Sequence, residues 1–372
     1  MSIDTDPQQS CGFAAYVGGP VIFTLSLMSL LTSAAVTYVN VSYAGSARRG
    51  QSCTPDGVVS GKVTRVGATA SILVLALCLL GVSVAQAQDD SWLGELGNSR
   101  EILADLNEEV VQIPLRGASA EEKKFPLTGT LYQPPGAGPF PLVILNHGSP
   151  TNGKDRDKMG RYRLIPQTRE LVRRGFAVLV PMRRGYGASP GDFVENSGSC
   201  ERGPDYAKAG NESARDVLSA VDYARTRRSL DAQRIVLMGQ SAGGFASLAA
   251  ASRVPAGLVA VVNLSGGRGG NGKDGMPCAP EVMAQTVARY AATIKAPVLW
   301  HYVENDRYFG PVASKSWFEA FERAGGKGRY VLQPSYGDDG HLLFYKAEAS
   351  AIWSSAMDNF FRAVGLPDLA LH

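Results

Sequence analysis

Short apolar runs alternate with amphipathic stretches from about residue 110 to residue 364 of this chain. The run Pro141–Asn146 is almost continuously apolar, which is typical of a strand buried on both faces of a parallel sheet. By contrast, Glu212–Arg225 carries apolar residues every three or four positions, which predicts an amphipathic helix. This alternation predicts an α/β fold, a mostly parallel sheet with helices on both faces.

The same pattern gives the order of the expected elements. Strands are expected at Val110–Pro114, Leu127–Tyr132, Pro141–Asn146, Phe176–Val180, Arg234–Met238, Leu258–Leu264, Pro297–Tyr302 and Arg329–Leu332. Helices are expected at Pro166–Arg174, Glu212–Arg225, Phe245–Ala250, Glu281–Ala292, Ala313–Ala324 and Glu348–Val364. The first two strands suit an antiparallel pair. The long, polar, Gly-rich segment Ser189–Gly210 predicts a small lid-like insertion or a side wall of a pocket.

Residues 62–87 have the order of a signal peptide. Lys62 and Arg65 precede the uncharged run Ile72–Val84, and Ala85-Gln86-Ala87 follows as an A-x-A cleavage site. The apolar run is short for a membrane-spanning helix. Cys78 lies between bulky leucines and is not a convincing lipidation site. We therefore expect cleavage after Ala87 and export of the mature chain.

A signal peptide is expected at the start of a chain, so two explanations for residues 1–61 are open. Translation begins near Val63, or the uncharged stretch Pro20–Val41 is a membrane segment. In the second case the basic residues that follow would lie on the cytoplasmic side, and residues 20–85 would anchor the protein. We favour the first explanation.

The predicted organisation therefore has four parts. An N-terminal extension over residues 1–61 precedes the signal peptide over 62–87, a linker over 88–108 and one folded domain over 109–367. The formal net charge of +3 is small for 372 residues, and no basic cluster is interleaved with aromatic residues. We expect no nucleic-acid partner, and membrane contact only through the N-terminal segment if it is not cleaved.

Of the five cysteines, only Cys200 and Cys278 follow the predicted cleavage site. Both lie in Gly-, Pro- and Asn-rich segments that are expected to be loops after successive strands. An exported chain folds in an oxidising compartment. We expect one disulfide between them; the alternative is two unpaired thiols.

The segment Gly239-Gln240-Ser241-Ala242-Gly243 stands between a predicted strand and a predicted helix. In that context G-x-S-x-G indicates a nucleophile elbow, a turn so tight that small residues such as Gly239 and Gly243 must flank the serine. The turn exposes the Ser241 hydroxyl and directs the Ala242 amide and the helix N-terminus toward a developing oxyanion. The alternative is a Gly-rich turn without chemistry.

A serine nucleophile needs a base within hydrogen-bond reach. His341 follows the last predicted strand in a loop rich in Gly and Asp, which can place the imidazole over the elbow, so we expect His341 to be the general base. His301 lies inside a strand pattern and is expected to be a packed residue of the sheet. His372 is the last residue of the chain.

The base in turn needs a group that holds its tautomer. Asp306 and Glu304 both follow the strand that precedes the last one, and we choose Asp306, with Glu304 as the nearest competitor. The alternative for this segment is a solvent-exposed turn.

The second amide donor for an oxyanion is expected in the loop His147-Gly148-Ser149-Pro150. Pro150 has no N–H, so the donor is Ser149 or Gly148. His147 is expected to brace this loop. We expect no metal and no cofactor, because no H-x-E, H-E-x-x-H or C-x-x-C spacing occurs and Gly266–Gly270 lacks the ending of a phosphate loop.

Five motifs fall in the order and rough spacing of the α/β-hydrolase superfamily: N-H-G-S-P, M-R-R-G-Y-G-A-S, G-Q-S-A-G-G, E-N-D and G-D-D-G-H. The chain from Val110 to Pro367 resembles the α/β-hydrolase fold, and within it the dienelactone hydrolase-like and acyl-peptidase-like group. The resemblance implies Ser241 as nucleophile, Asp306 as acid and His341 as base. Dienelactone hydrolases carry a cysteine where this chain has Ser241, which favours a serine esterase over a lactone hydrolase.

We expect an exported serine hydrolase that cleaves carboxylic esters through an acyl-enzyme. A serine peptidase acting on short peptides is one alternative, and it would need a charged anchor for a peptide terminus. Candidate anchors are Arg183, Arg184, Glu195 and Glu201, although the two arginines also suit a structural role tied to loop carbonyls. A catalytically inactive hydrolase fold used for binding is the second alternative.

Overall fold

The computed structural model of the protein describes residues 102–366. The predicted N-terminal extension, membrane segment, signal peptide and most of the linker lie outside the described residues, as does His372. Within residues 102–366, no helix combines the length and the apolar character needed to cross a membrane.

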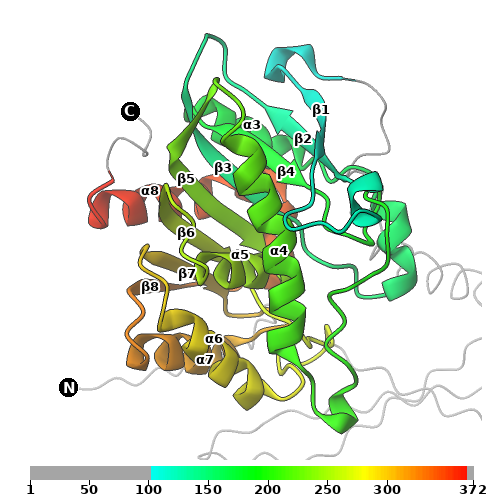
Figure 1. The fold of residues 1–372 in the computed structure, drawn as a ribbon. Helices are drawn as coiled ribbons and strands as arrows, with labels where there is room; N and C mark the ends of the chain where they lie inside the picture. The colour runs from blue at the N-terminus through cyan, green and yellow to red at the C-terminus, as the bar shows by residue number, and fades with distance from the viewer. Residues whose placement is uncertain (1–101, 367–372) are drawn as a thin grey trace, which may run out of the picture. The chain divides into compact units, whose positions relative to one another are not determined.

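Eight strands form one sheet in the described part of the chain (Figure 1). They are β1 (Glu109–Ile113), β2 (Leu127–Tyr132), β3 (Phe140–Asn146), β4 (Ala177–Pro181), β5 (Leu230–Gln240), β6 (Leu258–Leu264), β7 (Val298–Val303) and β8 (Gly328–Gln333). Their order across the sheet is β1-β2-β4-β3-β5-β6-β7-β8. β2 pairs antiparallel with β1 and β4, and every other pairing is parallel.

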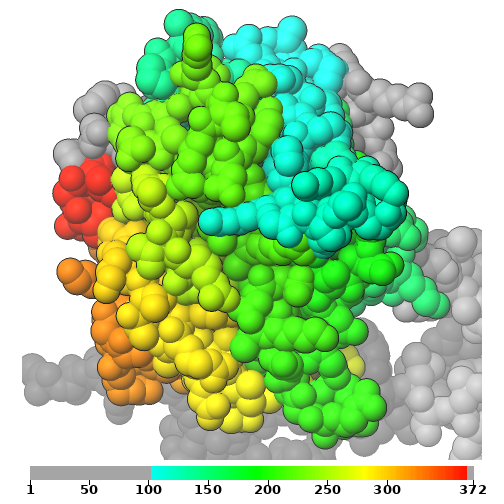
Figure 2. Space-filling view, in the orientation of Figure 1, coloured from blue at the N-terminus to red at the C-terminus, as the bar shows by residue number. Residues whose placement is uncertain are grey.

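Helices cover both faces of this sheet, as the apolar pattern predicts. The α-helices are α3 (Ile165–Arg173), α4 (Tyr206–Ala224), α5 (Ala242–Ala251), α6 (Pro280–Ala291), α7 (Pro311–Arg323) and α8 (Ser350–Ala363). Short 3-10 helices are η1 (Ala104–Leu106), η2 (Glu122–Lys124), η3 (Gly153–Met159), η4 (Cys200–Arg202), η5 (Gly340–Tyr345) and η6 (Ala347–Ala349). Figure 1 shows α4 and α5 in front of the sheet and α3 and α8 behind it. In Figure 2, α6, yellow, adjoins α4, green, and α7 packs against α6.

Two hydrophobic cores lie on the two faces of the sheet. Along β3, Leu142 and Ile144 join the core beneath α4 to α7, whereas Val143 and Leu145 join the core beneath α3 and α8. All four side chains are fully buried. Since successive side chains of a strand point to opposite faces, a strand covered on both sides needs an unbroken apolar run. That requirement explains the composition of Pro141–Asn146.

The structure moves one helix boundary well away from its prediction. α4 begins at Tyr206 rather than Glu212, and the Asp205 side chain caps it by accepting a 2.8 Å hydrogen bond from the Lys208 amide. An Asp at this position satisfies one of the free amides of the first turn. The extra turn brings the fully buried Tyr206 against the loop that follows β6, where its hydroxyl donates to the Cys278 carbonyl.

The predicted disulfide between Cys200 and Cys278 is present, with the two Cα atoms 5.7 Å apart. It joins the segment Ser189–Gly210 to the loop between β6 and α6. Within that segment Ser189 and Glu195 are buried. The segment is therefore attached to the domain at several points before α4 begins.

Candidate active site

Ser241 occupies the sharp turn between β5 and α5. Its backbone has φ 56° and ψ −124°, in the left-handed half of φ space that non-glycine residues rarely adopt. Such a conformation costs on the order of 1–3 kcal/mol and persists only where surrounding contacts enforce it. Here the Ser241 amide donates to the Leu264 carbonyl, and its carbonyl accepts from the Phe245 and Gly267 amides.

Close approaches explain why glycines flank this serine. A β-carbon on Gly239 would stand 2.4 Å from the carbonyl carbon and oxygen of Gly243. A β-carbon on Gly243 would stand 2.0 Å from the carbonyl oxygen of Asn146 at the end of β3. The turn can therefore close only if both positions lack a side chain, as the G-x-S-x-G motif predicts.

His341 and Asp306 are in direct contact. Nδ1 of His341 lies 3.0 Å from each carboxylate oxygen of Asp306, and both side chains are buried. Asp306 follows β7 and His341 lies in η5, so two loops at the carboxyl ends of neighbouring strands bring them together. A carboxylate at Nδ1 holds the proton on that nitrogen and leaves Nε2 free to accept one.

The carboxylate of Asp306 is held in its charged form. Burial alone would raise the pKa of Asp306, but His341 and the amides of Tyr308 and Phe309 outweigh it and lower the pKa below the usual range. Those two amides each donate to Oδ1 at 2.8 Å. Glu304, the competing acid, is exposed and accepts hydrogen bonds from Ser335 instead.

Three residues that the sequence did not indicate fix the position of His341. Asp339 accepts a 3.0 Å hydrogen bond from the His341 amide and caps η5. Gln240 donates to the His341 carbonyl at 3.0 Å, and the Tyr308 ring stacks on the imidazole with centroids 4.3 Å apart. The loop predicted after the last strand is therefore a 3-10 helix held by these contacts.

Ser241 and His341 line one cavity of about 370 Å³. Ser149 lines it too, as do the charged side chains of Asp155 and Lys273. The structure thus brings the predicted nucleophile, the predicted base and a predicted oxyanion donor to one opening at the carboxyl ends of the strands, where ligands bind in open α/β sheets.

The two predicted oxyanion donors flank Ser241. Ala242 is the first residue of α5, whose leading amides have no partner within the helix. On the other side, a β-carbon on Gly148 would stand 3.4 Å from the Ser241 β-carbon, so the loop after β3 passes directly beside the serine. The helix N-terminus adds a partial positive charge at the same point.

The other two histidines of the described chain are structural. His301 lies in β7, and burial lowers its pKa to about 4. His147 is fully buried; burial and the nearby charge of Arg183 lower the pKa of His147 well below its usual value. His147 contacts its own loop through a 2.7 Å bond between Nδ1 and the Gly148 carbonyl, consistent with a bracing role.

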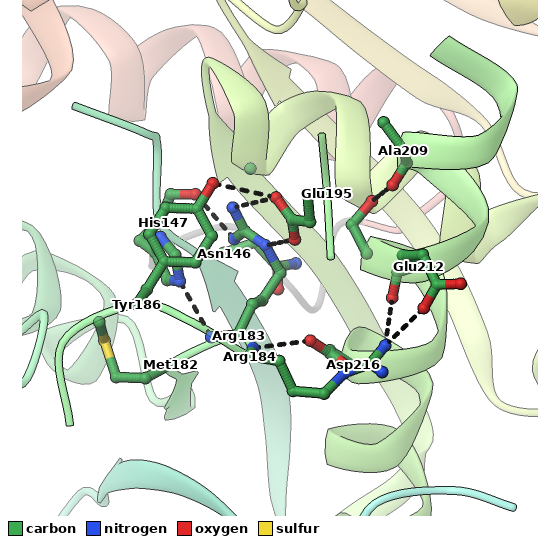
Figure 3. Close-up of polar contacts among 12 residues, drawn as sticks. Asn146, His147, Met182, Arg183, Arg184, Tyr186, Glu195, Ala209, Glu212 and Asp216 are labelled. Atoms are coloured by element: carbon green, nitrogen blue, oxygen red, sulfur yellow. Dashed lines mark hydrogen bonds and ion pairs between the residues drawn. The ribbon is translucent and has the colours of Figure 1, made fainter. Parts of the chain in front are cut away.

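Figure 3 shows where three of the four candidate peptide anchors lie. Arg183 and Glu195 are both fully buried and pair with each other. Arg184 pairs with Asp216 on α4, its Nε lying 2.7 Å from Oδ1. None of these three, nor the exposed Glu201, is among the residues lining the cavity that contains Ser241.

The segment Ser189–Gly210 does not cover the cavity as a lid, contrary to one reading of its length and composition. No residue of this segment lines the cavity, whereas residues 271–273 of the loop between β6 and α6 do. The segment is attached to that loop by the Cys200–Cys278 disulfide and by a hydrogen bond from Arg268 to the Glu195 carbonyl. Among residues 102–366, no group of three or more His, Cys, Asp or Glu side chains is placed to hold a metal ion.

Solved structures share this architecture. The acylaminoacyl peptidase of Pyrococcus horikoshii superposes with a TM-score of 0.50 at 16% identity, over 70% of this chain and 42% of that one. An esterase of Pyrococcus furiosus gives a TM-score of 0.49 at 16% identity, over 69% of this chain and 93% of its own. With the eight-stranded sheet and the turn at Ser241, the first likeness shows that the described part of the chain has the α/β-hydrolase fold.

Sequence comparisons give two further similarities. Residues 126–292 match the family described as X-Pro dipeptidyl-peptidase (S15 family). The acylamino-acid-releasing enzyme of Rattus norvegicus is 25% identical over 225 residues, which cover 54% of this chain and 29% of that enzyme. The chain thus spans under a third of that relative. The matched part of the chain is therefore similar to hydrolases of the serine peptidase and esterase group of α/β-hydrolases.

Proposed function

We propose that this protein hydrolyses carboxylic esters through an acyl-enzyme, with Ser241 as nucleophile, His341 as general base and Asp306 as the orienting acid. One observation carries the proposal: the His341 imidazole is bonded to Asp306 through Nδ1 while His341 and Ser241 line the same cavity. An oriented base that shares a cavity with a serine on a nucleophile elbow is the constellation that acyl transfer uses.

The reaction then proceeds in two halves. Ser241 Oγ attacks the ester carbonyl carbon as His341 Nε2 takes the hydroxyl proton, and the amides of Ala242 and Ser149 donate to the oxyanion. The tetrahedral intermediate collapses, and His341 gives its proton to the departing alkoxide, which leaves as alcohol. Water, deprotonated by His341, attacks the acyl-enzyme in the same way and releases the acid.

The charged residues that the sequence offered as peptide anchors give no support to a peptidase. Arg183, Glu195 and Arg184 are engaged in internal ion pairs, so none of them is presented to a peptide terminus in the cavity. Hydrolysis of a peptide bond by the same residues is the second candidate. It is favoured by the similarity to the X-Pro dipeptidyl-peptidase family and to the rat acylamino-acid-releasing enzyme.

Replacing Ser241 tests the mechanism. The Ser241→Ala variant should lose turnover of p-nitrophenyl acetate while its thermal unfolding midpoint does not fall. Wild-type turnover retained in this variant would contradict the proposal. Failure of the wild-type protein to react with a fluorophosphonate probe would instead support the inactive, binding alternative.

A matched pair of substrates separates the two candidate functions. N-acetylalanine p-nitrophenyl ester and N-acetylalanine p-nitroanilide share an acyl group and differ only in the leaving atom. We expect turnover of the ester with little or no turnover of the anilide. Comparable kcat/KM values on both would favour the peptidase.

We also propose that the protein is exported after cleavage following Ala87. The disulfide between Cys200 and Cys278 supports this, because such bonds persist in oxidising compartments. Expression of the full chain in a bacterium should yield periplasmic or secreted protein whose first residue is Gln88. Protein retained in the membrane with its N-terminus intact would support anchoring by residues 20–85.

A further inference from the structure

Glu195 is a fully buried carboxylate that two arginines share. Arg183 donates to it through Nε at 2.5 Å, and the Tyr186 hydroxyl donates at 3.1 Å (Figure 3). Arg268 donates to it through Nη2. Burial alone would raise the pKa of Glu195, but the two guanidinium groups outweigh it and lower the pKa to about 2. The proposed mechanism gives this buried ion cluster no task.

Arg183 connects Glu195 to the loop that carries the oxyanion donor. Its Nη1 donates to the His147 carbonyl at 2.8 Å, and its backbone amide donates to His147 Nε2 at 3.1 Å. Glu195 holds the other edge of the same guanidinium. The planar guanidinium therefore fixes the distance between a buried carboxylate and the backbone of this loop.

His147 transmits this constraint to the next peptide. Because Nε2 accepts from the Arg183 amide, the ring proton of the neutral imidazole is on Nδ1 and donates to the Gly148 carbonyl at 2.7 Å. A trans peptide is planar, with its C=O and N–H pointing in opposite directions. Fixing the Gly148 carbonyl therefore fixes the direction of the Ser149 N–H.

We propose that Glu195 is a positioning residue that aims the Ser149 amide at the oxyanion, acting through Arg183 and His147. This inference rests on the proposed acyl transfer at Ser241. In this proposal the segment Ser189–Gly210 is not a lid. It supplies the Glu195 carboxylate that orients the loop carrying Ser149. The second arginine that pairs with Glu195, Arg268, belongs to the loop between β6 and α6, whose residues 271–273 line the cavity. The Glu195 carboxylate therefore connects that loop to the loop that carries Ser149.

The Glu195→Gln variant tests the proposal. An amide cannot accept from both arginines, because one end of it is a donor. We expect kcat for p-nitrophenyl acetate to fall about 10- to 100-fold with little change in KM, less than the 10²–10³ typical of removing a donor outright. Arg183→Lys, which keeps the charge but loses the fork between Glu195 and the His147 carbonyl, should behave alike.

A thionoester distinguishes a misaimed donor from a general loss of structure. Its sulfur is a weak hydrogen-bond acceptor, so its turnover depends less on the oxyanion donors. The ratio of kcat for p-nitrophenyl acetate to kcat for the matching thionoacetate should therefore fall about 10-fold or more in both variants. A change in folding alone would lower both rates equally and leave the ratio unchanged.

Asp216→Asn is the matched control. Asp216 is another buried carboxylate, pairs with the adjacent Arg184 and makes no contact with the His147 loop among its hydrogen bonds (Figure 3). This variant should keep the wild-type ratio even if its unfolding midpoint drops. An unchanged ratio in folded Glu195→Gln and Arg183→Lys would overturn the proposal. A wild-type protein without any Ser241-dependent turnover would instead overturn the proposed function.

Discussion

The backbone of Gly148 passes directly beside the side chain of Ser241. A β-carbon on Gly148 would stand 3.4 Å from the β-carbon of Ser241 and 2.7 Å from Oε1 of Gln240. The Tyr345 hydroxyl would be 2.8 Å away, and it is itself hydrogen-bonded to Gln240 at 2.6 Å. The space that a methyl group would need is therefore occupied by a bonded pair that also supports the His341 loop.

Replacing Gly148 by Ala should consequently damage catalysis. The added methyl group forces the loop away from Ser241 or displaces Gln240, which bonds to the His341 carbonyl. We expect kcat/KM for p-nitrophenyl acetate to fall about 10²–10³-fold, the range seen when an oxyanion donor is lost. Unfolding midpoints measured on the same protein separate this effect from misfolding. Wild-type kinetics in the variant would show that the loop accommodates the methyl group without loss of activity.

Asp306→Asn should be severely impaired. An amide at this position cannot hold the His341 proton on Nδ1 as a carboxylate does, and the wrong tautomer leaves no base at Nε2; losses of about 10⁴ in kcat follow from this in comparable triads. Glu304→Gln is the control, since Glu304 is exposed and bonds to Ser335. Equal losses in both variants would reopen the choice between the two acids.

Removing the disulfide should lower stability rather than chemistry. Cys200 and Cys278 are separated by 78 residues, and cross-links of that kind are typically worth about 2–5 kcal/mol. We expect the Cys200→Ser/Cys278→Ser double variant to unfold at lower urea concentration, and its midpoint to be insensitive to dithiothreitol. A wild-type midpoint that does not respond to the reductant would contradict this expectation.

His301 should make the protein sensitive to mild acid. Its folded-state pKa of about 4 lies below the unfolded value of about 6.5, so the neutral form is favoured on folding. The contribution of neutral His301 to the free energy of unfolding is therefore fully present above pH 6.5, and it is lost as the pH falls toward 4. Its size is about 3 kcal/mol, at about 1.4 kcal/mol for each pKa unit.

Urea unfolding of the wild type and of His301→Phe between pH 7 and pH 4 measures this effect. Phenylalanine has a similar volume and does not titrate, so the variant should lose less unfolding free energy over that range. Parallel curves for the two proteins would show that another group is responsible for the acid sensitivity.

Local sequence was enough to predict the turn at Ser241, the strands and the segment whose carboxylate contacts His341. Gly239 and Gly243 mark the turn because their spacing reflects contacts within a few residues. Asp306 and Glu304 differ by only two positions; their place after the strand that precedes the last one predicted the acid in this segment, and the resemblance to the α/β-hydrolases implied Asp306. In these cases the determining interactions are close in the chain, or follow from the order of strands in a parallel sheet.

The supporting residues could not be predicted in this way. Gln240 acts on a carbonyl 101 positions away, and nothing in its neighbours indicates this. Glu195 has the sequence context of an exposed loop residue, yet it is fully buried and pairs with Arg183 and with Arg268, 73 positions away. The first turn of α4 was missed because its polar residues obscure the apolar period, although Tyr206 and Ala209 are buried there. Such features depend on tertiary packing.

The backbone strain at Ser241 has a consequence for evolution. A glycine would adopt φ 56° and ψ −124° without penalty, so an inactive Ser241→Gly protein would be more stable than the natural one. Selection for thermal stability alone would favour that inactive variant. Keeping serine at this position therefore costs part of the free energy of unfolding. A more stable active variant has to gain that free energy from substitutions elsewhere in the domain.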